Sequence, residues 1–226
     1  MYSLTERESL LLVSSNLERI LGDQPKRIEL LNKALKENPA SAICRYLLAR
    51  DAYNKKNYDE VITLLRPTIE SRFDEIRSFI LYAIAVSIYD KNYARAIAVL
   101  KQADAIAWTD PIFVATLGGM NSLSGNTSEA ENIFERAKKQ RFPEEEARKV
   151  AYQPIDLADT KLDITTTGTV IVPKSAYLLI QSKQYGKFFL PSPKVKGVYV
   201  KAQTVLEFTI SYTPKGGLAL NPNIVR

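Results

Sequence analysis

The residue types that most enzymes use for catalysis are scarce in this chain of 226 residues. It contains no histidine, so a Ser-His-Asp triad, a Cys-His dyad and a His-ligated zinc or iron site are all excluded. Its single cysteine, Cys44, lies on an apolar helical stretch, and we predict that it is a core residue. We therefore predict no catalytic residue, no metal site and no cofactor, and we predict that the protein is not an enzyme.

Positively charged side chains are the remaining candidates for chemistry, and they gather in the C-terminal part. Residues 161–226 contain nine Lys and Arg against two Asp and Glu, whereas residues 1–160 contain 22 against 23. This asymmetry is typical of a segment that meets a polyanion, and the alternative is a solubilising surface that binds nothing. The composition changes at the same place, from helix-forming residues before Pro154 to strand and turn residues after Thr160.

The elements that must position these residues begin with a helical part that repeats every 34 or 35 residues. Four polar turns, which end at Arg27, Val61, Ala96 and Ala130, each precede an apolar helical run. These runs cover 28–35, 61–65, 97–103 and 133–137. Two short helices repeated at this period stack into a solenoid. Residues 144–151 begin with three glutamates, which suit the positive end of a helix dipole, and we predict a capping helix there.

The repeated part resembles the tetratricopeptide repeat over residues 5–143. The matches are the Gly-Asp/Asn turns, the aromatic residues before the second helix and the small residues late in it: Gly22, Asp23, Gly125, Asn126, Tyr58, Tyr93, Ala34, Ala103 and Ala137. Arg27 and Thr68 depart from the pattern, because the repeat ordinarily has alanine at those positions.

The resemblance implies that a protein or peptide binds in a concave groove lined by the first helix of each pair. The positions that map to this groove are Tyr46, Arg50, Tyr53, Asn54, Ile88 and Tyr89. Such a mixture of aromatic and basic residues suits an extended acidic or aromatic peptide. The alternative is that the groove packs against another part of a larger polypeptide, or against the C-terminal part of this chain.

The C-terminal part has the pattern of a small β-barrel. Five strand-like runs cover 167–172, 177–181, 187–190, 204–212 and 217–225, and turn residues separate them. In the fourth run Leu206, Phe208, Ile210 and Tyr212 alternate with more polar residues, as in a half-buried strand. Five strands in this length fit a closed barrel. We therefore predict a helical-repeat domain of about four helix pairs plus the capping helix at 1–152, a linker at 153–162 and a barrel at 163–226.

This barrel resembles the cold-shock domain, a five-stranded OB-fold. Gly168-Thr169-Val170 is similar to the opening of that family, and 204–210 is similar to its fourth strand. The run 214–221, Pro-Lys-Gly-Gly-Leu-Ala-Leu-Asn, is similar to the family's ending, Pro-Lys-Gly-x-x-Ala-x-Asn. Residues 176–180 and 188–191 occupy the places of its two nucleic-acid-binding motifs, although their sequences differ. The resemblance implies that bases of single-stranded RNA or DNA stack on aromatic rings above a basic groove.

Strand alternation assigns side chains to the two faces of this barrel. Tyr177 is expected outside, Leu178 and Ile180 are expected in the core, and one of Phe188 and Phe189 is expected outside. The sequence does not decide between the two phenylalanines. The predicted nucleic-acid-binding residues are therefore Lys174, Tyr177, Lys183, Lys187, Phe188, Phe189, Lys194, Lys196 and Lys215.

Taken together, the sequence predicts an α+β multidomain protein, an α-solenoid of helix pairs followed by a five-stranded OB-fold barrel. Its predicted function is a non-enzymatic module that joins an unidentified protein or peptide to single-stranded RNA or DNA. The alternative is a purely protein-binding adaptor, or the C-terminal interaction or sensor region of a larger regulatory protein. No membrane partner is expected because no apolar run approaches the ~18 residues of a membrane span. One cysteine and no secretory signal favour the cytoplasm.

Overall fold

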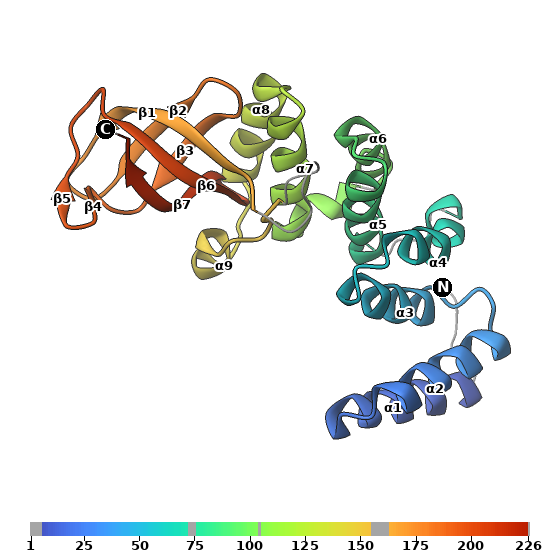
Figure 1. Ribbon diagram of the computed structural model, residues 1–226. Coiled ribbons are helices and arrows are strands. Elements are labelled where there is room, and N and C mark those ends of the chain that lie inside the picture. The colour runs from blue at the N-terminus through green and yellow to red at the C-terminus, as the bar shows by residue number, and fades with distance from the viewer. Residues whose placement is uncertain (1–5, 72–75, 104, 155–162, 226) are drawn as a thin grey trace. The chain divides into compact units, whose positions relative to one another are not determined.

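The computed structural model describes residues 6–71, 76–103, 105–154 and 163–225 (Figure 1). The chain divides into two compact units, Met1–Tyr89 and Asp90–Arg226. The described part of the first unit is helical, and the second unit contains further helices and a closed β-barrel. The predicted α+β fold class, with helical repeats followed by a five-stranded barrel, is confirmed. Most of the linker predicted at 153–162 lies outside the described residues, which omit 155–162.

The first unit is built from helix hairpins in which α1 packs on α2 and α3 packs on α4. Its described helices are α1 (Glu6–Leu21), α2 (Gln24–Glu37), α3 (Ala42–Asn54), α4 (Tyr58–Glu70) and α5 (Ile76–Tyr89). Gly22 has a φ of +83° in the tight turn between α1 and α2, a conformation that glycine adopts without strain. Asp23 caps α2 and Ser41 caps α3, each by accepting a hydrogen bond from a backbone N–H of the first turn.

Arg27, one of the two departures from the repeat pattern, has a partner in the next helix hairpin. The Arg27 side chain is buried in the first unit, and its guanidinium forms an ion pair with the carboxylate of Asp51 on α3. Arg27 also donates to the side-chain oxygen of Gln24 at 3.5 Å. The ion pair joins α2 to α3, so this departure from the repeat pattern links two neighbouring helix hairpins.

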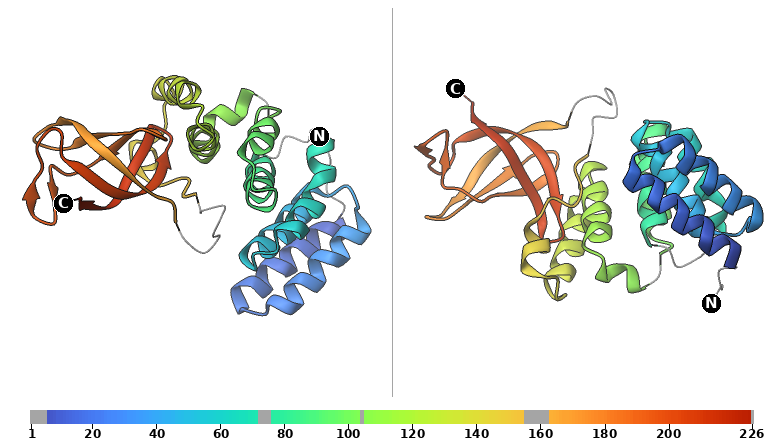
Figure 2. Two further views of the ribbon diagram at one scale, coloured as in Figure 1. Left: turned by 45° about the horizontal axis from the view of Figure 1, so that its top comes forward. Right: turned by 90° about the horizontal axis from the view of Figure 1, so that it is seen from below.

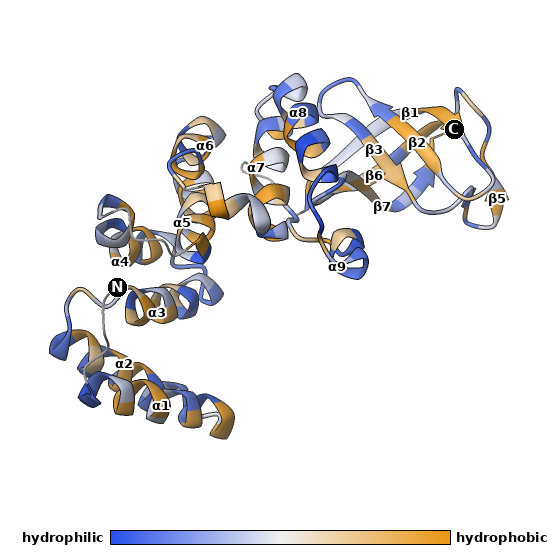
Figure 3. Ribbon diagram, turned by 180° about the vertical axis from the view of Figure 1, so that it is seen from behind, coloured by the Kyte–Doolittle hydropathy of each residue, from blue (hydrophilic) through white to orange (hydrophobic). Residues whose placement is uncertain are grey.

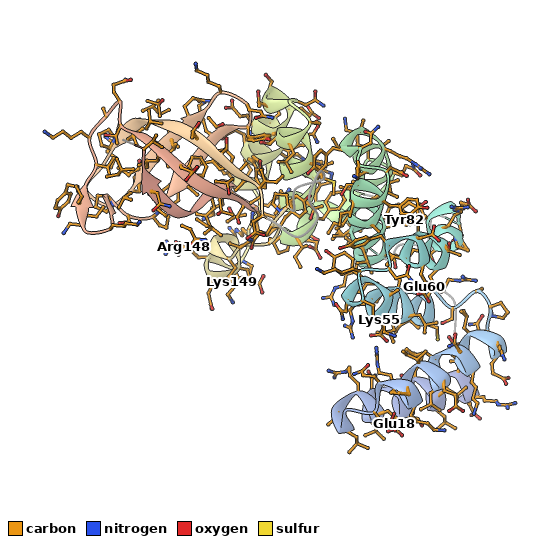
Figure 4. All side chains as sticks on the ribbon, in the orientation of Figure 1. Glu18, Lys55, Glu60, Tyr82, Arg148 and Lys149 are labelled. Atoms are coloured by element: carbon orange, nitrogen blue, oxygen red, sulfur yellow. The ribbon has the colours of Figure 1, made fainter. Side chains whose placement is uncertain are left out.

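Two helices of the second unit, α6 (Tyr93–Leu100) and α9 (Glu144–Arg148), are shorter than the sequence predicts. The other described helices of this unit are the 3-10 helix η1 (Ala105–Thr109), α7 (Pro111–Leu123) and α8 (Thr127–Lys138). The predicted run to Ala103 stops at Leu100, where backbone hydrogen bonds tighten to a spacing of three residues. The predicted capping helix over 144–151 stops at Arg148, because Ala151 and Tyr152 donate their backbone N–H groups to the carbonyl of Tyr212. Figure 4 shows Arg148 and Lys149 at the end of α9.

The barrel closes in the strand order β1-β2-β3-β7-β6. Its strands are β1 (Thr165–Pro173), β2 (Leu178–Ser182), β3 (Gly186–Leu190), β6 (Val205–Thr213) and β7 (Gly216–Ile224). β3 and β7 are parallel and the other neighbours are antiparallel. Because β6 returns to lie beside β1, strands β6-β1-β2-β3 form a Greek key. A short hairpin that the sequence analysis missed, β4 (Lys194–Val195) and β5 (Val198–Tyr199), lies between β3 and β6.

The barrel core is formed by side chains that point inward from alternate positions of the strands. Its fully buried side chains are Val170, Leu178, Ile180, Phe188, Leu206, Phe208, Ile210, Tyr212 and Ala219. Glycine is required where strands approach most closely, because a Cβ on Gly217 would lie 2.7 Å from the carbonyl oxygen of Lys187. Figures 1 and 2 both show the barrel beside α7 and α8, which belong to the same unit.

Candidate functional site

Two aromatic rings lie together on the outer face of the barrel. Tyr177 directly precedes β2 and Phe189 lies in β3, and their ring centroids are 5.1 Å apart with planes inclined by 39°. Leu179 pairs with Phe189 across the two strands, so alternation places Tyr177, Leu179 and Phe189 on the same face. Phe189 is 41% exposed, and Tyr177 is half-buried. These two side chains, the ring pair, form a surface on which a flat ligand can stack.

Phe188, which the sequence analysis also included, points into the barrel. Its side chain is 0% exposed, and its ring centroid lies 5.1 Å from that of Phe208 and 5.9 Å from that of Tyr212. The register pairs Phe188 with the buried Ile180, and the alternation that sends Phe189 outward sends Phe188 inward. The assignment of Phe188 to a nucleic-acid-binding surface is therefore wrong, and Phe189 is the outward ring.

An apolar row crosses the same outer face. The sheet register connects Val172 to Leu179, Leu179 to Phe189 and Phe189 to Leu218. Phe189 is exposed and the other three side chains are half-buried. We call these four residues the outer row. A β-bulge between Val170 and Val172 gives β1 one extra residue opposite β2. This bulge brings Val172 into register with Leu179 and so into the outer row.

The lysines predicted to bind phosphate are all exposed, but the barrel places them at two opposite ends. β1, β2 and β3 form a meander, so the β1–β2 loop and the end of β3 share one end, and the β2–β3 turn lies at the other. The end away from α7 and α8, here called the free end, includes the β4–β5 hairpin (Figure 1). The free end carries Lys174, Lys194 and Lys196, and the helix-facing end carries Lys183, Lys187 and Lys215.

The ring pair lies near the free end, which also carries Lys174, Lys194 and Lys196. The backbone N–H of Lys174 donates to the carbonyl of Tyr177 at 2.9 Å, which keeps this lysine beside the ring pair. On the hairpin, the Lys194 ammonium lies 4.3 Å from the ring centroid of the exposed Tyr199. By contrast, Lys187 at the helix-facing end forms an ion pair of 3.1 Å with Glu131 on α8. Only the free end therefore combines exposed aromatic rings with lysines that lack an ion pair among the described contacts.

The helix-facing end of the barrel is closed by α7 and α8. Tyr212, which is buried in this contact, donates its hydroxyl to Ser122 Oγ on α7 at 2.7 Å, and Ser122 Oγ donates to the carbonyl of Tyr185 at 2.5 Å. The Tyr212 ring lies between those of Phe134 and Tyr152, each with a centroid separation of 6.2 Å. Burial raises the pKa of Tyr212 well above its usual range, so its hydroxyl stays neutral and donates. We call this contact the Tyr212 junction.

Gly119 on α7 makes the Tyr212 junction possible. A Cβ at this position would lie 2.7 Å from ring atoms of both Tyr152 and Tyr212, which is closer than carbon atoms pack. The small residue lets the two rings lie directly on the helix backbone. No local sequence pattern reveals this junction, because its partners Ser122 and Tyr212 are 90 residues apart along the chain.

The predicted groove residues of the first unit lie mainly on α3. Tyr46, Arg50 and Tyr53 are spaced by four and three residues, so they share one helical face, and all three are half-buried. Burial raises the pKa of Tyr53, whose ring meets Tyr58 edge-on at 5.7 Å.

The other predicted groove residues differ in exposure. Asn54 is exposed at the end of α3, and Tyr89 is exposed at the end of α5. Ile88 is buried and does not line a groove, because it lies on the packed face of α5.

Cysteine and carboxylate side chains are the groups of this chain that could hold a metal ion. Cys44 is buried in the core of the first unit, and burial raises the pKa of its thiol, which disfavours the reactive thiolate. Within the described ranges, no three His, Cys, Asp or Glu side chains form a group that could hold a metal ion. The helices in these ranges are too short or too polar to cross a membrane.

Solved structures share the helical-repeat fold. PilW, described as a widely conserved type IV pilus biogenesis factor, is 18% identical, aligns with 64% of this chain and 69% of its own, and has a TM-score of 0.52. A MamA protein is also 18% identical, with 58% and 71% aligned and a TM-score of 0.50. A thermophilic TPR protein of Thermus thermophilus is 20% identical, with 57% and 72% aligned and a TM-score of 0.46.

The likenesses to PilW and MamA concern the fold, and they support the predicted tetratricopeptide-like arrangement of the helices. No family model matches the sequence, and no curated protein matches it.

Proposed function

We propose that this protein is a non-catalytic binding module. Its helical repeats hold a protein or peptide, and the free end of its barrel holds single-stranded RNA or DNA. The observation that carries the nucleic-acid part is the ring pair, two outward aromatic side chains in contact, beside the exposed lysines of the free end. A base that stacks on such a surface gains ~1–3 kcal/mol, and nearby ammonium groups attract the phosphates on either side of it.

The fold of each part supports this proposal. Stacked helix pairs form extended concave surfaces that suit protein or peptide partners. The Greek-key order of the barrel is compatible with the OB-fold and with the cold-shock resemblance in the sequence, and OB-folds present strands of one face to oligonucleotides. The described acids of the barrel are Asp163 and Glu207, so its charge favours an anionic ligand.

The most selective test replaces one aromatic ring and keeps the outer row apolar. Phe189→Leu preserves an aliphatic side chain in the outer row but removes the aromatic face. We expect it to weaken binding of a labelled oligouridylate or oligothymidylate of about twelve nucleotides by about 5- to 150-fold, as measured by fluorescence anisotropy. The matched control is Ile112→Leu, which changes a similarly exposed residue on α7. Equal affinities of wild type and Phe189→Leu would refute stacking on this ring.

Two double variants test where the phosphates of the nucleic acid bind, because they make the same change in charge at opposite ends of the barrel. Lys174→Glu with Lys196→Glu alters the free end, and Lys183→Glu with Lys215→Glu alters the helix-facing end. Both double variants change the net charge equally, so a difference between them reports location. The free-end variant should bind the oligonucleotide at least tenfold more weakly than the other. Equal losses would mean that only the overall charge matters.

The outer row favours a second candidate, an adaptor that binds proteins through both parts. Three of its four side chains are aliphatic, and a protein partner buries such residues, whereas a base gains most from a flat ring. For this function, Leu179→Ser would abolish partner binding and Phe189→Leu would be tolerated. Absence of oligonucleotide binding at ~50 mM salt would favour the adaptor over the nucleic-acid-binding module.

A further inference from the structure

The first helix carries large aliphatic side chains on a face that nothing in the described structure covers. Leu10 is 68% exposed, Val13 59%, Leu17 55%, Ile20 71% and Leu21 76%. We call these five residues the α1 stripe. Figure 3 shows hydrophobic residues along α1. Single exposed leucines are common on protein surfaces, but five on a helix of 16 residues form a continuous patch.

The α1 stripe lies opposite the face that α1 uses inside its own unit. Glu8, Leu12 and Ser15 are buried, and α1 packs on α2 through them. At 100° per residue, the centre of this buried face and the centre of the α1 stripe are roughly 170° apart around the helix. The helix therefore packs one face inside its own unit and carries a second, apolar face on the opposite side, and an apolar helix face is normally covered.

We propose that the α1 stripe is a dimer interface, on which α1 of a second copy of this chain packs in antiparallel orientation. Leu10, Val13, Leu17 and Ile20 follow the alternating three- and four-residue spacing of a helix–helix seam. A twofold axis midway between Val13 and Leu17 places Leu10 against the partner's Ile20 and Val13 against the partner's Leu17. The surface is therefore complementary to itself, as a twofold interface requires.

The area of the α1 stripe suits a second copy. With these exposed fractions, its five side chains present roughly 600 Å² to solvent, at the upper end of patches on monomer surfaces. Complete burial of the α1 stripe on both copies removes about 1,200 Å² from solvent, which is the lower limit for a stable, specific interface.

The charges favour the antiparallel orientation of this pair. Ser9, Ser14 and Asn16 flank the seam and carry no charge, so a second helix can approach without stripping water from ions. Arg7, which forms an ion pair with Glu37 on α2 at 3.2 Å, and Asp23, which caps α2, lie beyond opposite ends of the seam, and both are exposed. Antiparallel packing brings Arg7 towards the partner's Asp23 and aligns the helix dipoles favourably, whereas parallel packing brings Arg7 towards the partner's Arg7.

Sedimentation velocity of the full chain tests this proposal. At about 50 µM the wild type should sediment at twice the monomer mass of 25.4 kDa. Leu10→Ser with Leu17→Ser changes only exposed positions and should raise the dimer dissociation constant at least 100-fold. Ile106→Ser with Val198→Ser removes two similarly exposed aliphatic side chains elsewhere and should leave the dimer intact. Helical circular dichroism equal to that of the wild type shows that the variants fold.

Disulfide trapping tests the orientation. A chain with Leu10→Cys mixed with a chain with Ile20→Cys should form a covalent dimer on mild oxidation, and neither chain alone should do so. The native Cys44 is buried and stays out of the reaction. Three results would overturn the proposal: a monomeric wild type, a Leu10→Ser/Leu17→Ser variant that remains dimeric, or efficient cross-linking of Leu10→Cys with itself.

Discussion

Ser122→Ala should selectively destabilise the second unit, because Ser122 is the centre of the Tyr212 junction. Its hydroxyl accepts a hydrogen bond from Tyr212 at 2.7 Å and donates one to the carbonyl of Tyr185 at 2.5 Å. The alanine variant loses both bonds and leaves a buried phenol without its acceptor. An unsatisfied buried donor costs ~1–3 kcal/mol and the second hydrogen bond adds ~1 kcal/mol, so we expect the free energy of unfolding to fall by about 2–4 kcal/mol.

The chain's single tryptophan makes this measurement possible. Trp108 lies in η1 of the second unit, with the Arg136 guanidinium 3.7 Å from its ring centroid, so its fluorescence reports unfolding of that unit in urea. Ser124→Ala is the matched control, because this exposed hydroxyl bonds only to the carbonyl of Asn121 in its own helix. We expect the control to lose less than ~1 kcal/mol.

A double-mutant cycle isolates the bond to the phenol. Tyr212→Phe alone should cost ~1 kcal/mol, and adding it to Ser122→Ala should cost little more, because the stranded donor is then gone. A Ser122→Ala variant as stable as Ser124→Ala, or strictly additive effects of Ser122→Ala and Tyr212→Phe, would refute the account of the junction.

Three further predictions concern the ionisation of Tyr212, the Arg27–Asp51 ion pair and the close strand contact at Gly217. Burial raises the pKa of Tyr212 in the folded state, so the neutral phenol contributes its full stability below the unfolded pKa of ~10, and this contribution is lost progressively at higher pH. Urea titrations between pH 9 and 11 should therefore show a steeper fall in the free energy of unfolding for wild type than for Tyr212→Phe. Asp51→Ala should destabilise the first unit by ~3–5 kcal/mol, measured by helical circular dichroism, because it leaves the buried guanidinium of Arg27 uncompensated; a loss below ~1 kcal/mol would contradict this. Gly217→Ala should cost ~1–3 kcal/mol, measured by Trp108 fluorescence in urea, because the backbone of Lys187 cannot move away from the new methyl group; unchanged stability would contradict the close strand contact.

Most of the fold was predictable because short-range sequence patterns determine its helices and strands. The 34- or 35-residue period of turns and apolar runs predicts the helix hairpins, and strand-forming runs separated by turn residues predict the five barrel strands. The β4–β5 hairpin was missed because each of its strands has two residues, too few for an alternating pattern. The choice between Phe188 and Phe189 depends on strand register, which a run of adjacent aromatic residues does not reveal.

The features that the sequence did not predict depend on contacts between distant residues. Arg27 departs from the repeat pattern, and only the packed structure shows Asp51 beside it. The lysines form one group by composition, but the strand order separates them into two ends of the barrel. The α1 stripe consists of leucine, isoleucine and valine, residue types that normally indicate core, so its exposure became evident only once the helices were placed.

Salt dependence of oligonucleotide binding tests the central claim most directly. The measurement uses the full chain, because Tyr212 of the barrel is buried against α7. The three exposed lysines at the free end predict a slope of log affinity against log salt of about −2 for a single strand, reduced in magnitude by about 1.4 in the Lys174→Glu/Lys196→Glu variant. The absence of binding at ~50 mM salt, or a slope that this variant leaves unchanged, would contradict nucleic-acid recognition by the free end.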